Sequence, residues 1–182
     1  GNYHQSTSRI YTDFGLITAD EAITADVNTL FLEITGLGKP GRLNKLYQSP
    51  FTLYKMLLSR INQEIEHARA GKPARIIAKM NALIEPSIIE ALYAASQAGV
   101  KIDLIVRGMC TLRPGVAGLS HNIHVISIIG RQLEHSRIYY FHNNGEENTY
   151  IASADWMERN FFRRIEVATP IEETGLKARV IR

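Results

Sequence analysis

Two short apolar segments constrain the fold of this chain most: ARIIAK at residues 74–79 and IDLIV at residues 102–106. Near-continuous apolar runs of this length are typical of strands that are buried on both faces of a parallel sheet. The segment between them, Pro86–Ala98, has apolar residues at helical spacing. A strand–helix–strand unit is right-handed and makes its two strands parallel neighbours. We therefore expect an α/β fold with these two strands at the centre of the sheet.

Further strands are predicted after this unit. Residues 137–141 (RIYYF) and 149–153 (TYIAS) are rich in β-branched and aromatic types, and Asn143-Asn144-Gly145 between them has the composition of a turn. The two segments predict a β-hairpin. Apolar runs at residues 123–129 and 165–169 predict two more strands. Together these segments predict a mixed sheet with helices packed against it.

The first 44 residues predict a strand, a helix and a linker. Ser8–Phe14 resembles a strand but has no strand before it, so we expect the chain to begin within a domain. Residues 18–21 (TADE) have the pattern of a capping box. The helix after it is expected to end at Gly36 and to bury an apolar stripe of Ile23, Val27, Leu30, Phe31 and Ile34. Residues 36–44 (GLGKPGRLN) are predicted as an interdomain linker, because they lack the spacing of a P-loop.

A second long helix is expected directly after the linker. Ser49 is the predicted N-cap and Pro50 the first helical residue, and Gly71 closes the helix. Its predicted buried stripe is Leu53, Leu57, Ile61, Ile65 and Ala68. We accordingly divide the chain at residues 1–44 and 45–182.

His135 is the main candidate for chemistry. Imidazole exchanges protons near neutral pH and can accept a phosphoryl group, so His135 is a candidate nucleophile or general acid; a structural polar residue is the alternative. His135 precedes the first hairpin strand, whereas Ser153, Asp155 and Asn160 close or follow the second. We expect these two groups at opposite ends of the hairpin unless a loop folds back.

Arginines supply the other candidate site residues. Arg107 ends a predicted parallel strand, where ligands of open α/β sheets gather, and its guanidinium suits a phosphate; a surface ion pair is the alternative. Near the hairpin, Arg137, Arg163 and Arg164 would stabilise the charge of a phosphoryl-transfer transition state. Two carboxylates, Asp155 and Glu134, are candidates to orient His135 or to pair with an arginine; solvated surface carboxylates are the alternative. No His/Cys cluster or carboxylate pair predicts a metal site.

The composition is that of a globular protein with a mild positive charge. The 182 residues carry a net charge of +3, with a pI near 9.0, and the basic residues are spread along the chain. This charge suits a polyanionic ligand, but the spread argues against a dedicated nucleic-acid surface. The apolar runs are too short to span a bilayer, because a transmembrane helix needs about 20 consecutive apolar residues. Cys110 is alone and the first residues lack a signal-peptide pattern, so we expect a cytoplasmic protein.

Long strings of this chain resemble the C-terminal half of the bacterial polyphosphate kinase family: GNYHQSTSRIYTDFGLITAD, KPARIIAKMNALIEPSIIEALYAASQAGVKIDLIVRGMC, LRPGV, EHSRIYYF and SADWMERN. His135-Ser136-Arg137 also resembles the H-x-K motif of the phospholipase D superfamily, with Arg137 in the lysine position and His142 where that superfamily has an aspartate. The resemblance implies a phospholipase D-like mixed sheet flanked by helices. Residues 1–44 would end a first phospholipase D-like C-terminal domain and include the linker, and residues 45–182 would form most of a second.

The resemblance also implies an activity and its residues. The intact enzyme would transfer the terminal phosphate of ATP reversibly to polyphosphate through a phosphohistidine. His135 and Arg164 would be catalytic, and His135 would also contact ATP; Arg164 begins an R-I-E string that matches the family. Arg107, in LIVRGMC, matches a nucleotide-contacting arginine, and Tyr11, in RIYTD, matches a tyrosine near the ATP base. The phosphorylated histidine and the Mg²⁺ ligands would lie upstream, so we expect the chain alone to be inactive.

The implied partners are ATP or ADP and inorganic polyphosphate, without nucleic acid. The resemblance further implies a homo-oligomer in the intact enzyme and is compatible with peripheral membrane association. One alternative is a phospholipase D-like phosphodiesterase or nuclease, against which His142 and the bulky Trp156 argue. Another is a non-enzymatic basic module that binds nucleic acid, which salt-dependent binding to oligonucleotide would reveal.

Overall fold

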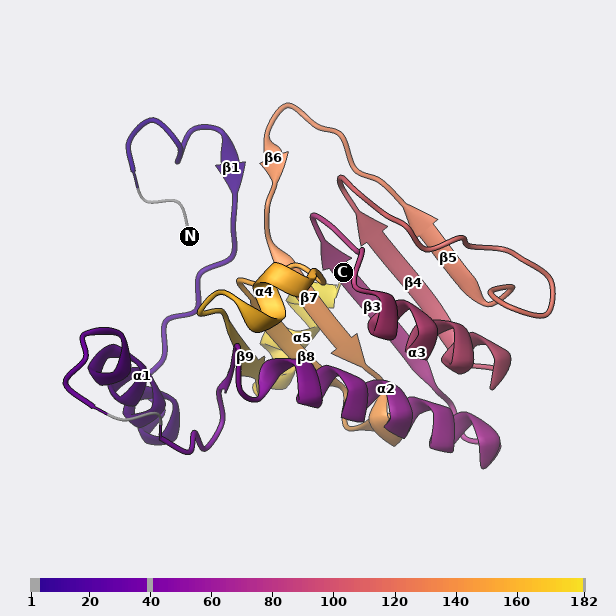
Figure 1. Cartoon of the computed structure of the whole chain (residues 1–182), viewed down its shortest axis with the longest axis horizontal. Coiled ribbons are helices and arrows are strands. Elements are labelled where there is room, and N and C mark those ends of the chain that lie inside the picture. Colours follow the sequence, from indigo (N-terminus) through magenta and orange to yellow (C-terminus); the bar gives the residue numbers. More distant parts are fainter. Residues whose placement is uncertain (1–3, 39–40, 182) are drawn as a thin grey trace.

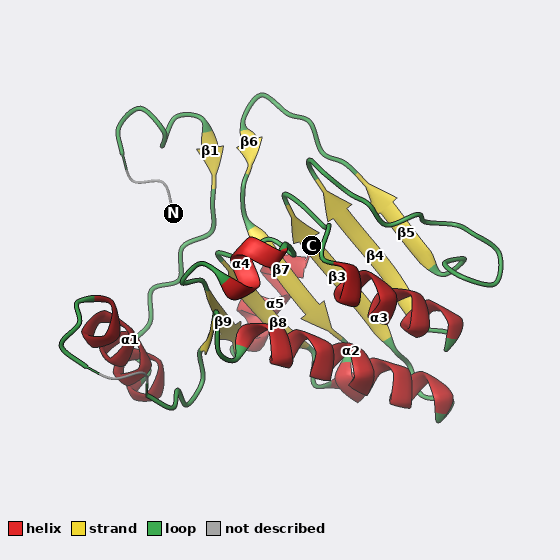
Figure 2. Cartoon of the chain, viewed as in Figure 1, coloured by secondary structure: helices red, strands yellow, loops and turns green. Residues whose placement is uncertain are grey.

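A seven-stranded mixed sheet forms the body of the structure, a computed structural model that describes residues 4–38 and 41–181 (Figures 1 and 2). The predicted fold class, a mixed sheet flanked by helices, is confirmed. Strands β3, β4 and β5 are parallel to one another, and every other neighbouring pair is antiparallel. The spatial order of the strands is β2 (Tyr47–Gln48), β9 (Val167–Ile171), β8 (Asn148–Ala152), β7 (Arg137–Phe141), β3 (Arg75–Met80), β4 (Lys101–Val106) and β5 (Ile123–Ile126).

The predicted strand–helix–strand unit is β3, α3 (Pro86–Gln97) and β4. β3 and β4 are parallel neighbours, and neither lies at an edge of the sheet, although β4 is next to the edge strand β5. The expectation that these two strands are buried on both faces of the sheet is wrong. Ile76 is fully buried beneath the helices, whereas Ile77 points to the other face and is half-buried. On that face Ile77 shares a pocket with the end of the short helix α5 (Thr174–Ile181), which covers the sheet less completely.

Helix α2 (Leu53–Arg69) lies beside α3 and covers the same face of the sheet (Figure 1). The predicted stripe is confirmed, since Leu53, Leu57 and Ile61 are all fully buried. The predicted start of the helix is wrong. Ser49 donates its N–H to the carbonyl of Glu166 at 2.9 Å and thereby continues the β2–β9 ladder, so the helix begins only at Leu53.

The N-terminal helix α1 (Glu21–Ile34) lies to one side of the sheet (Figure 1). Its N-cap is Asp20, whose carboxylate accepts the N–H of Ile23 at 2.9 Å, so the expected capping box beginning at Thr18 is wrong. Leu30 is buried but Phe31 is 64% exposed, and only part of the predicted stripe is therefore packed.

Buried Asp26 joins α1 to the residues that follow the predicted linker. Its carboxylate accepts the N–H groups of Asn44, Lys45 and Leu46 at 2.7–2.9 Å. Burial raises the pKa of Asp26, but these backbone donors outweigh it and hold the pKa below its usual value. The described residues of 36–44 form no helix or strand, as predicted, and residues 39 and 40 lie outside the described part of the chain.

The expected strand Ser8–Phe14 is shorter than predicted and does have a partner. Only β1 (Tyr11–Thr12) is extended, and it pairs in parallel with β6 (Leu133–Glu134). This two-stranded sheet stands apart from the main sheet, above the start of β7 in Figure 1. It brings the N-terminal segment next to His135.

The predicted hairpin is formed by β7 and β8, which are joined by the short turn η1 (Asn143–Gly145). Asn143 and Asn144 both adopt positive φ angles there, of 44° and 54°. The expectation that His135 and Ser153 lie at opposite ends is wrong. In an antiparallel pair the start of one strand lies beside the end of the other, and Arg137 indeed pairs with Ala152.

In the described part of the chain, no helix combines the length and the apolar character needed to cross a membrane.

Candidate active site

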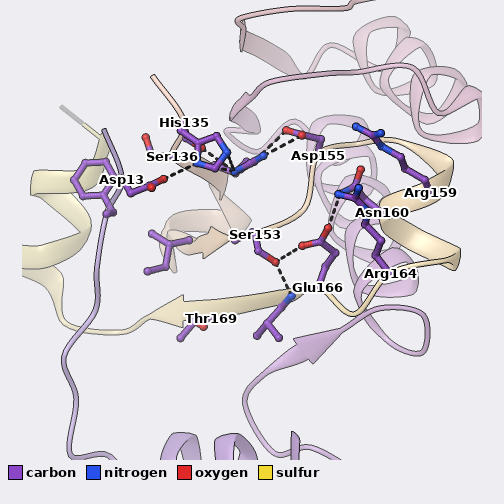
Figure 3. Close-up of a pocket in the computed structure, with 15 residues that line it drawn as sticks. Asp13, His135, Ser136, Ser153, Asp155, Arg159, Asn160, Arg164, Glu166 and Thr169 are labelled. Carbon is purple, nitrogen blue, oxygen red and sulfur yellow. Dashed lines mark hydrogen bonds and ion pairs between the residues drawn. The ribbon is translucent and has the colours of Figure 1, made fainter. Parts of the chain in front are cut away.

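A pocket of about 460 Å³ opens at the end of the sheet where β7 begins and β8 ends (Figure 3). Its walls come from the segment after β1, from the start of β7, from the loop after β8, from the start of β9 and from the short helix α4 (Glu158–Phe162) with the turn that follows it. The polar side chains that line it are Asp13, His135, Ser136, Arg137, Ser153, Asp155, Arg159, Asn160, Arg164, Glu166 and Thr169.

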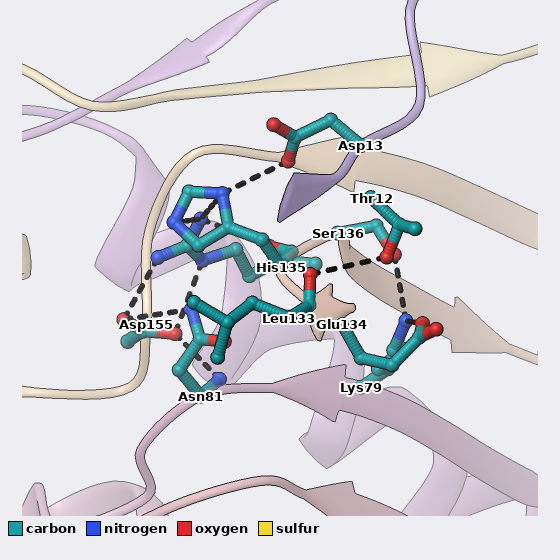
Figure 4. Close-up of polar contacts among 10 residues, drawn as sticks. Thr12, Asp13, Lys79, Asn81, Leu133, Glu134, His135, Ser136 and Asp155 are labelled. Atoms are coloured by element: carbon teal, nitrogen blue, oxygen red, sulfur yellow. Dashed lines mark hydrogen bonds and ion pairs between the residues drawn. The ribbon is translucent and has the colours of Figure 1, made fainter. Parts of the chain in front are cut away.

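His135 is held by the N-terminal segment (Figure 4). Its backbone N–H donates to the carbonyl of Thr12 at 3.1 Å, which extends the β1–β6 ladder. The Nδ1 atom of its ring lies 2.9 Å from Oδ1 of Asp13. Tyr11 packs edge-on against the imidazole with a centroid separation of 4.8 Å. A carboxylate at Nδ1 fixes the ring orientation and favours the tautomer that carries its proton on Nδ1.

The guanidinium of Arg137 lies against the ring of His135. Its Nη1 atom is 3.0 Å from Nε2 and 3.3 Å from Nδ1. Because both ring nitrogens are this close to one atom, Nη1 lies over the face of the ring rather than in line with one lone pair. Nη1 also donates to the His135 carbonyl at 3.0 Å. Arg137 therefore positions both the ring and the backbone of His135.

Asp155 neutralises Arg137. The carboxylate accepts from Nε and Nη2 of Arg137, each at 3.1 Å, and from the N–H of Asn81 at 2.7 Å. The two charged side chains are only 12% and 9% exposed. Burial raises the pKa of Asp155, but the guanidinium and the Asn81 donor lower it further, so the pKa lies below its usual value. Asp155 is thus an arginine partner, one of the two roles predicted for it.

A second buried carboxylate, Glu166, supports the other wall of the pocket. It accepts hydrogen bonds from the hydroxyl of Ser153 and from Nδ2 of Asn160, the latter at 2.6 Å (Figure 3). Ser153 Oγ in turn accepts the N–H of Val167 at 3.0 Å. These bonds tie α4 and the start of β9 to the end of β8.

Two exposed arginines, Arg159 and Arg164, line the pocket on this side. Neither has an ion-pair partner among the residues that the structure describes. Asp155 already neutralises Arg137, and the lining carboxylates Asp13 and Glu166 balance the formal charge of these two guanidiniums. Arg159 and Arg164 are therefore the cations of the pocket whose donors are open to a ligand. Arginine presents several donors in a planar fork, which suits the oxygens of a phosphate.

Lys79 fixes the two neighbours of His135 from the sheet below. Its Nζ donates to Glu134 at 2.8 Å and to Ser136 at 2.7 Å (Figure 4). The hydrogen bond from Lys79 lowers the pKa of Glu134. Glu134 was predicted to orient His135 or to pair with an arginine; both roles are wrong, because the lysine on β3 lies closer to it.

The structure brings together three of the four residues that were predicted to share one site. His135 and Arg164 line the pocket, and Tyr11 contacts His135. Arg107 directly follows β4, at the same end of the sheet, but is not part of the lining. Its Nη1 atom is buried and has no hydrogen-bond partner among the described residues. The roles of these residues in binding ATP and in catalysis stay predictions.

Arg163 does not line the pocket. It forms an exposed ion pair with Glu158 at 3.0 Å, so the expectation that it serves the site together with Arg164 gains no support.

The sequence reasoning missed four residues: Asp13, Lys79, Arg159 and Glu166. Asp13 stands two positions after Tyr11, but its contact with His135 depends on pairing between segments 122 residues apart. Arg159 was hidden in the string SADWMERN, and Glu166 was noted only as part of R-I-E. Because α4 is short, helical periodicity gave no signal for which of its side chains faces a pocket.

The described residues do not form a metal site. No group of three or more His, Cys, Asp or Glu side chains is placed to hold an ion among them. The pocket carboxylates already accept from other groups: Asp13 from His135, Asp155 from Arg137, and Glu166 from Ser153 and Asn160. These residues therefore do not fit Mg²⁺ by themselves.

Comparison with known proteins identifies relatives over the whole chain. A model of "Polyphosphate kinase C-terminal domain 1" matches residues 1–40, and one of "Polyphosphate kinase C-terminal domain 2" matches residues 46–182. The polyphosphate kinase of Neisseria gonorrhoeae is 79% identical over all 182 residues, which make up 27% of that protein. The crystal structure of the polyphosphate kinase from Porphyromonas gingivalis superposes with a TM-score of 0.95 at 42% identity, covering all of this chain and 28% of that one.

A more distant structure shares the fold alone. Nuc from Salmonella typhimurium, a phospholipase D family member, matches with a TM-score of 0.52 at 15% identity and covers 75% of this chain and 88% of its own. The predicted phospholipase D-like architecture is thus confirmed. The chain spans about a quarter of the length of the polyphosphate kinases that it matches. By its match to the model of C-terminal domain 2 over residues 46–182, the chain belongs to the polyphosphate kinase family.

Proposed function

We propose that the pocket around His135 binds the terminal phosphates of a nucleotide and takes part in the reversible transfer of the terminal phosphate of ATP to polyphosphate. The transferred group would be carried by a phosphohistidine at another histidine. The observation that carries this proposal is the composition of the pocket, in which an imidazole held by Asp13 shares one cavity with the exposed guanidiniums of Arg159 and Arg164. The substrates are chosen because the relatives are named polyphosphate kinases.

The geometry suggests a role for each group. Negative charge spreads over the phosphoryl oxygens in the transition state, and positioned donors are the main source of its stabilisation. Arg159 and Arg164 would supply these donors. His135 would give a proton to the oxygen that leaves phosphorus and recover it in the reverse direction. Asp13, 2.9 Å from Nδ1, would stabilise the imidazolium. Arg137 is ion-paired with Asp155 and would act by positioning the ring.

Tyr11 and Arg107 are proposed to bind the nucleotide. The Tyr11 ring packs against His135, so a base beside it would place the phosphates near the imidazole. Arg107 lies at the same end of the sheet, and a phosphate oxygen would satisfy its buried Nη1.

The remaining parts of the proposal concern the longer protein. Mg²⁺ would accompany the nucleotide, with ligands outside the described residues. The protein would be cytoplasmic and homo-oligomeric, and any membrane contact would be peripheral. Light scattering on the purified protein tests the oligomeric state, and cell fractionation tests the localisation and the membrane contact.

The test uses a full-length family protein that contains this chain. His135→Ala should reduce polyphosphate synthesis by about 10² to 10⁴, the usual cost of losing an acid–base group, while ATP affinity changes only a few-fold. His67→Gln, on the outer side of α2, is the matched control and should leave synthesis unchanged. The 182-residue chain alone should transfer no label from γ-labelled ATP.

Three outcomes would contradict the proposal. Acid-labile phosphorylation of the chain alone would make His135 or His4 the nucleophile. Cleavage of a chromogenic phosphodiester that depends on His135 would indicate a phosphodiesterase. Salt-dependent binding of oligonucleotide without binding of polyphosphate would indicate a nucleic-acid-binding module.

A further inference from the structure

A second cleft, of about 610 Å³, lies at the end of the sheet opposite the His135 pocket. It is formed where the parallel strands β3, β4 and β5 begin and where the antiparallel strand β7 ends (Figure 1). Its charged and titratable lining residues are Arg75, Lys101, Asp103, His121, His124 and His142. We call this set the basal cleft.

The strand register explains why these residues meet. Arg75 pairs with Lys101 at the start of β3 and β4, and Asp103 pairs with His124 across β4 and β5. His142 follows the last residue of β7 and donates its N–H to the carbonyl of Arg75 at 2.9 Å. The basal cleft is therefore built largely from residues at the ends of paired strands.

Positive charge prevails in the basal cleft. Arg75 binds Asp103 through Nε at 3.1 Å and Nη2 at 2.6 Å, which leaves its Nη1 donor for another acceptor. Both partners are at least 40% exposed, so this pair contributes little to stability. Lys101 is exposed and has no ion-pair partner among the described residues. With neutral histidines the cleft carries one net positive charge, from Arg75 and Lys101 against Asp103.

Three histidines add further hydrogen-bonding groups to the basal cleft. His124 is exposed, and the Nδ1 atom of His142 is buried without a hydrogen-bond partner among the described residues. A ligand oxygen would accept a hydrogen bond from that atom in the tautomer that carries the ring proton on Nδ1. The carboxylate that approaches from α2, Glu64, is already engaged by the N–H groups of Arg75 and Asn143.

We propose that the basal cleft binds a linear oligophosphate. Its basic side chains, Arg75, Lys101 and His124, stand near the starts of three neighbouring strands about 4.8 Å apart, so they suit an extended anion rather than a single phosphate. The described lining contains no Phe, Tyr or Trp on which nucleic-acid bases would stack. No group of three His, Cys, Asp or Glu side chains among the described residues is placed to hold a metal ion.

The basal cleft is separate from the His135 pocket. Seven residue steps along β7 and its flanks separate His135 from His142, which corresponds to roughly 20 Å at the usual strand rise. An oligophosphate in the cleft would therefore be held to the protein without occupying the reaction pocket. The choice of polyphosphate over other linear polyanions rests on the proposed function.

The test measures binding of a linear polyphosphate of defined length to the 182-residue chain by calorimetry. The cleft variant is Lys101→Gln with His124→Gln, both exposed positions. The matched control is Lys55→Gln with His67→Gln, which removes the same two residue types from the outer side of α2. Thermal unfolding verifies that both variants are folded. A third variant, Arg159→Gln with Arg164→Gln, removes the cations of the other pocket.

The cleft variant should bind polyphosphate at least about tenfold more weakly than the control, since each lost charge-assisted hydrogen bond costs about that factor. Equal affinities of the cleft variant and the control would overturn the proposal. Loss of binding only in the Arg159/Arg164 variant would also overturn it while supporting the proposed function. Equal binding of an oligonucleotide would show a general polyanion surface and refute the assignment to phosphate polymers.

Discussion

Replacing Asp155 with alanine should destabilise the fold by about 3–5 kcal/mol, the usual cost of removing one partner from a buried ion pair. The variant leaves the guanidinium of Arg137, which is 12% exposed, without its counter-charge. It also removes the acceptor of the Asn81 N–H, which lies 2.7 Å from the carboxylate. These losses share one site, so they are not additive. Asp155→Asn keeps one acceptor oxygen and should cost only about 1–3 kcal/mol.

The chain offers both a probe and a control for this experiment. Trp156 is the single tryptophan, is fully buried and adjoins Asp155, so its fluorescence reports urea unfolding at the site itself. The control is Asp103→Ala, because Asp103 pairs with Arg75 at 2.6 Å but the two side chains are 40% and 50% exposed. An exposed pair contributes about 0–1 kcal/mol. Equal costs for Asp155→Ala and Asp103→Ala would refute the reasoning from burial.

The same pair predicts the pH dependence of stability. The pKa of Asp155 is lower in the folded state, so its contribution is present above the unfolded value of about 3.9 and is lost as the pH falls through the folded pKa. The unaltered chain should therefore lose stability more steeply than Asp155→Asn below about pH 4. Parallel curves for the two proteins in urea titrations at several pH values would contradict this expectation.

Three further predictions follow from single contacts. Asp26→Ala leaves three backbone N–H groups without their acceptor and should cost about 1–3 kcal/mol, with faster amide hydrogen exchange at residues 44–46 as the signature. Leu57→Ala empties a fully buried position and should cost about 2–5 kcal/mol in urea unfolding, whereas Phe31→Ala, at 64% exposure, should cost less than about 0.5 kcal/mol. Lys79→Met removes the partner that lowers the pKa of Glu134, so an NMR titration of Glu134 should show its pKa rising; an unchanged value would show that Lys79 is not the cause.

The elements that depend on local pattern could be predicted from the sequence. Local sequence pattern is enough to predict the strands β3 and β4 and the buried stripe that includes Leu57, because apolar periodicity depends only on neighbouring residues. The start of α2 could not be predicted in this way. Ser49 and Pro50 have good N-cap chemistry, but the backbone bond from Ser49 to Glu166 outweighs this local preference.

The candidate site was predictable only in part, for the same physical reason. Resemblance singled out His135 and Arg164 because they stand in recognisable strings. Asp13 reaches His135 only through pairing of β1 with β6, and no periodic signal connects two segments so far apart. Lys79 lies within an apolar strand, where its role depends on which neighbour β6 presents to it.

Because the site depends on the pairing of β1 with β6, it can open locally while the main sheet stays folded. The seven-stranded sheet uses no residue before Tyr47, whereas the amides of Leu133 and His135 donate to the carbonyls of Ile10 and Thr12 in the N-terminal segment. Closing a loop of this length costs conformational entropy, and the few contacts of two-residue strands offset little of that cost. This ladder is therefore expected to open more often than the main sheet. Each opening withdraws Asp13 from His135 while the core stays folded. A population that is fully native by tryptophan fluorescence can therefore contain molecules whose site is disassembled.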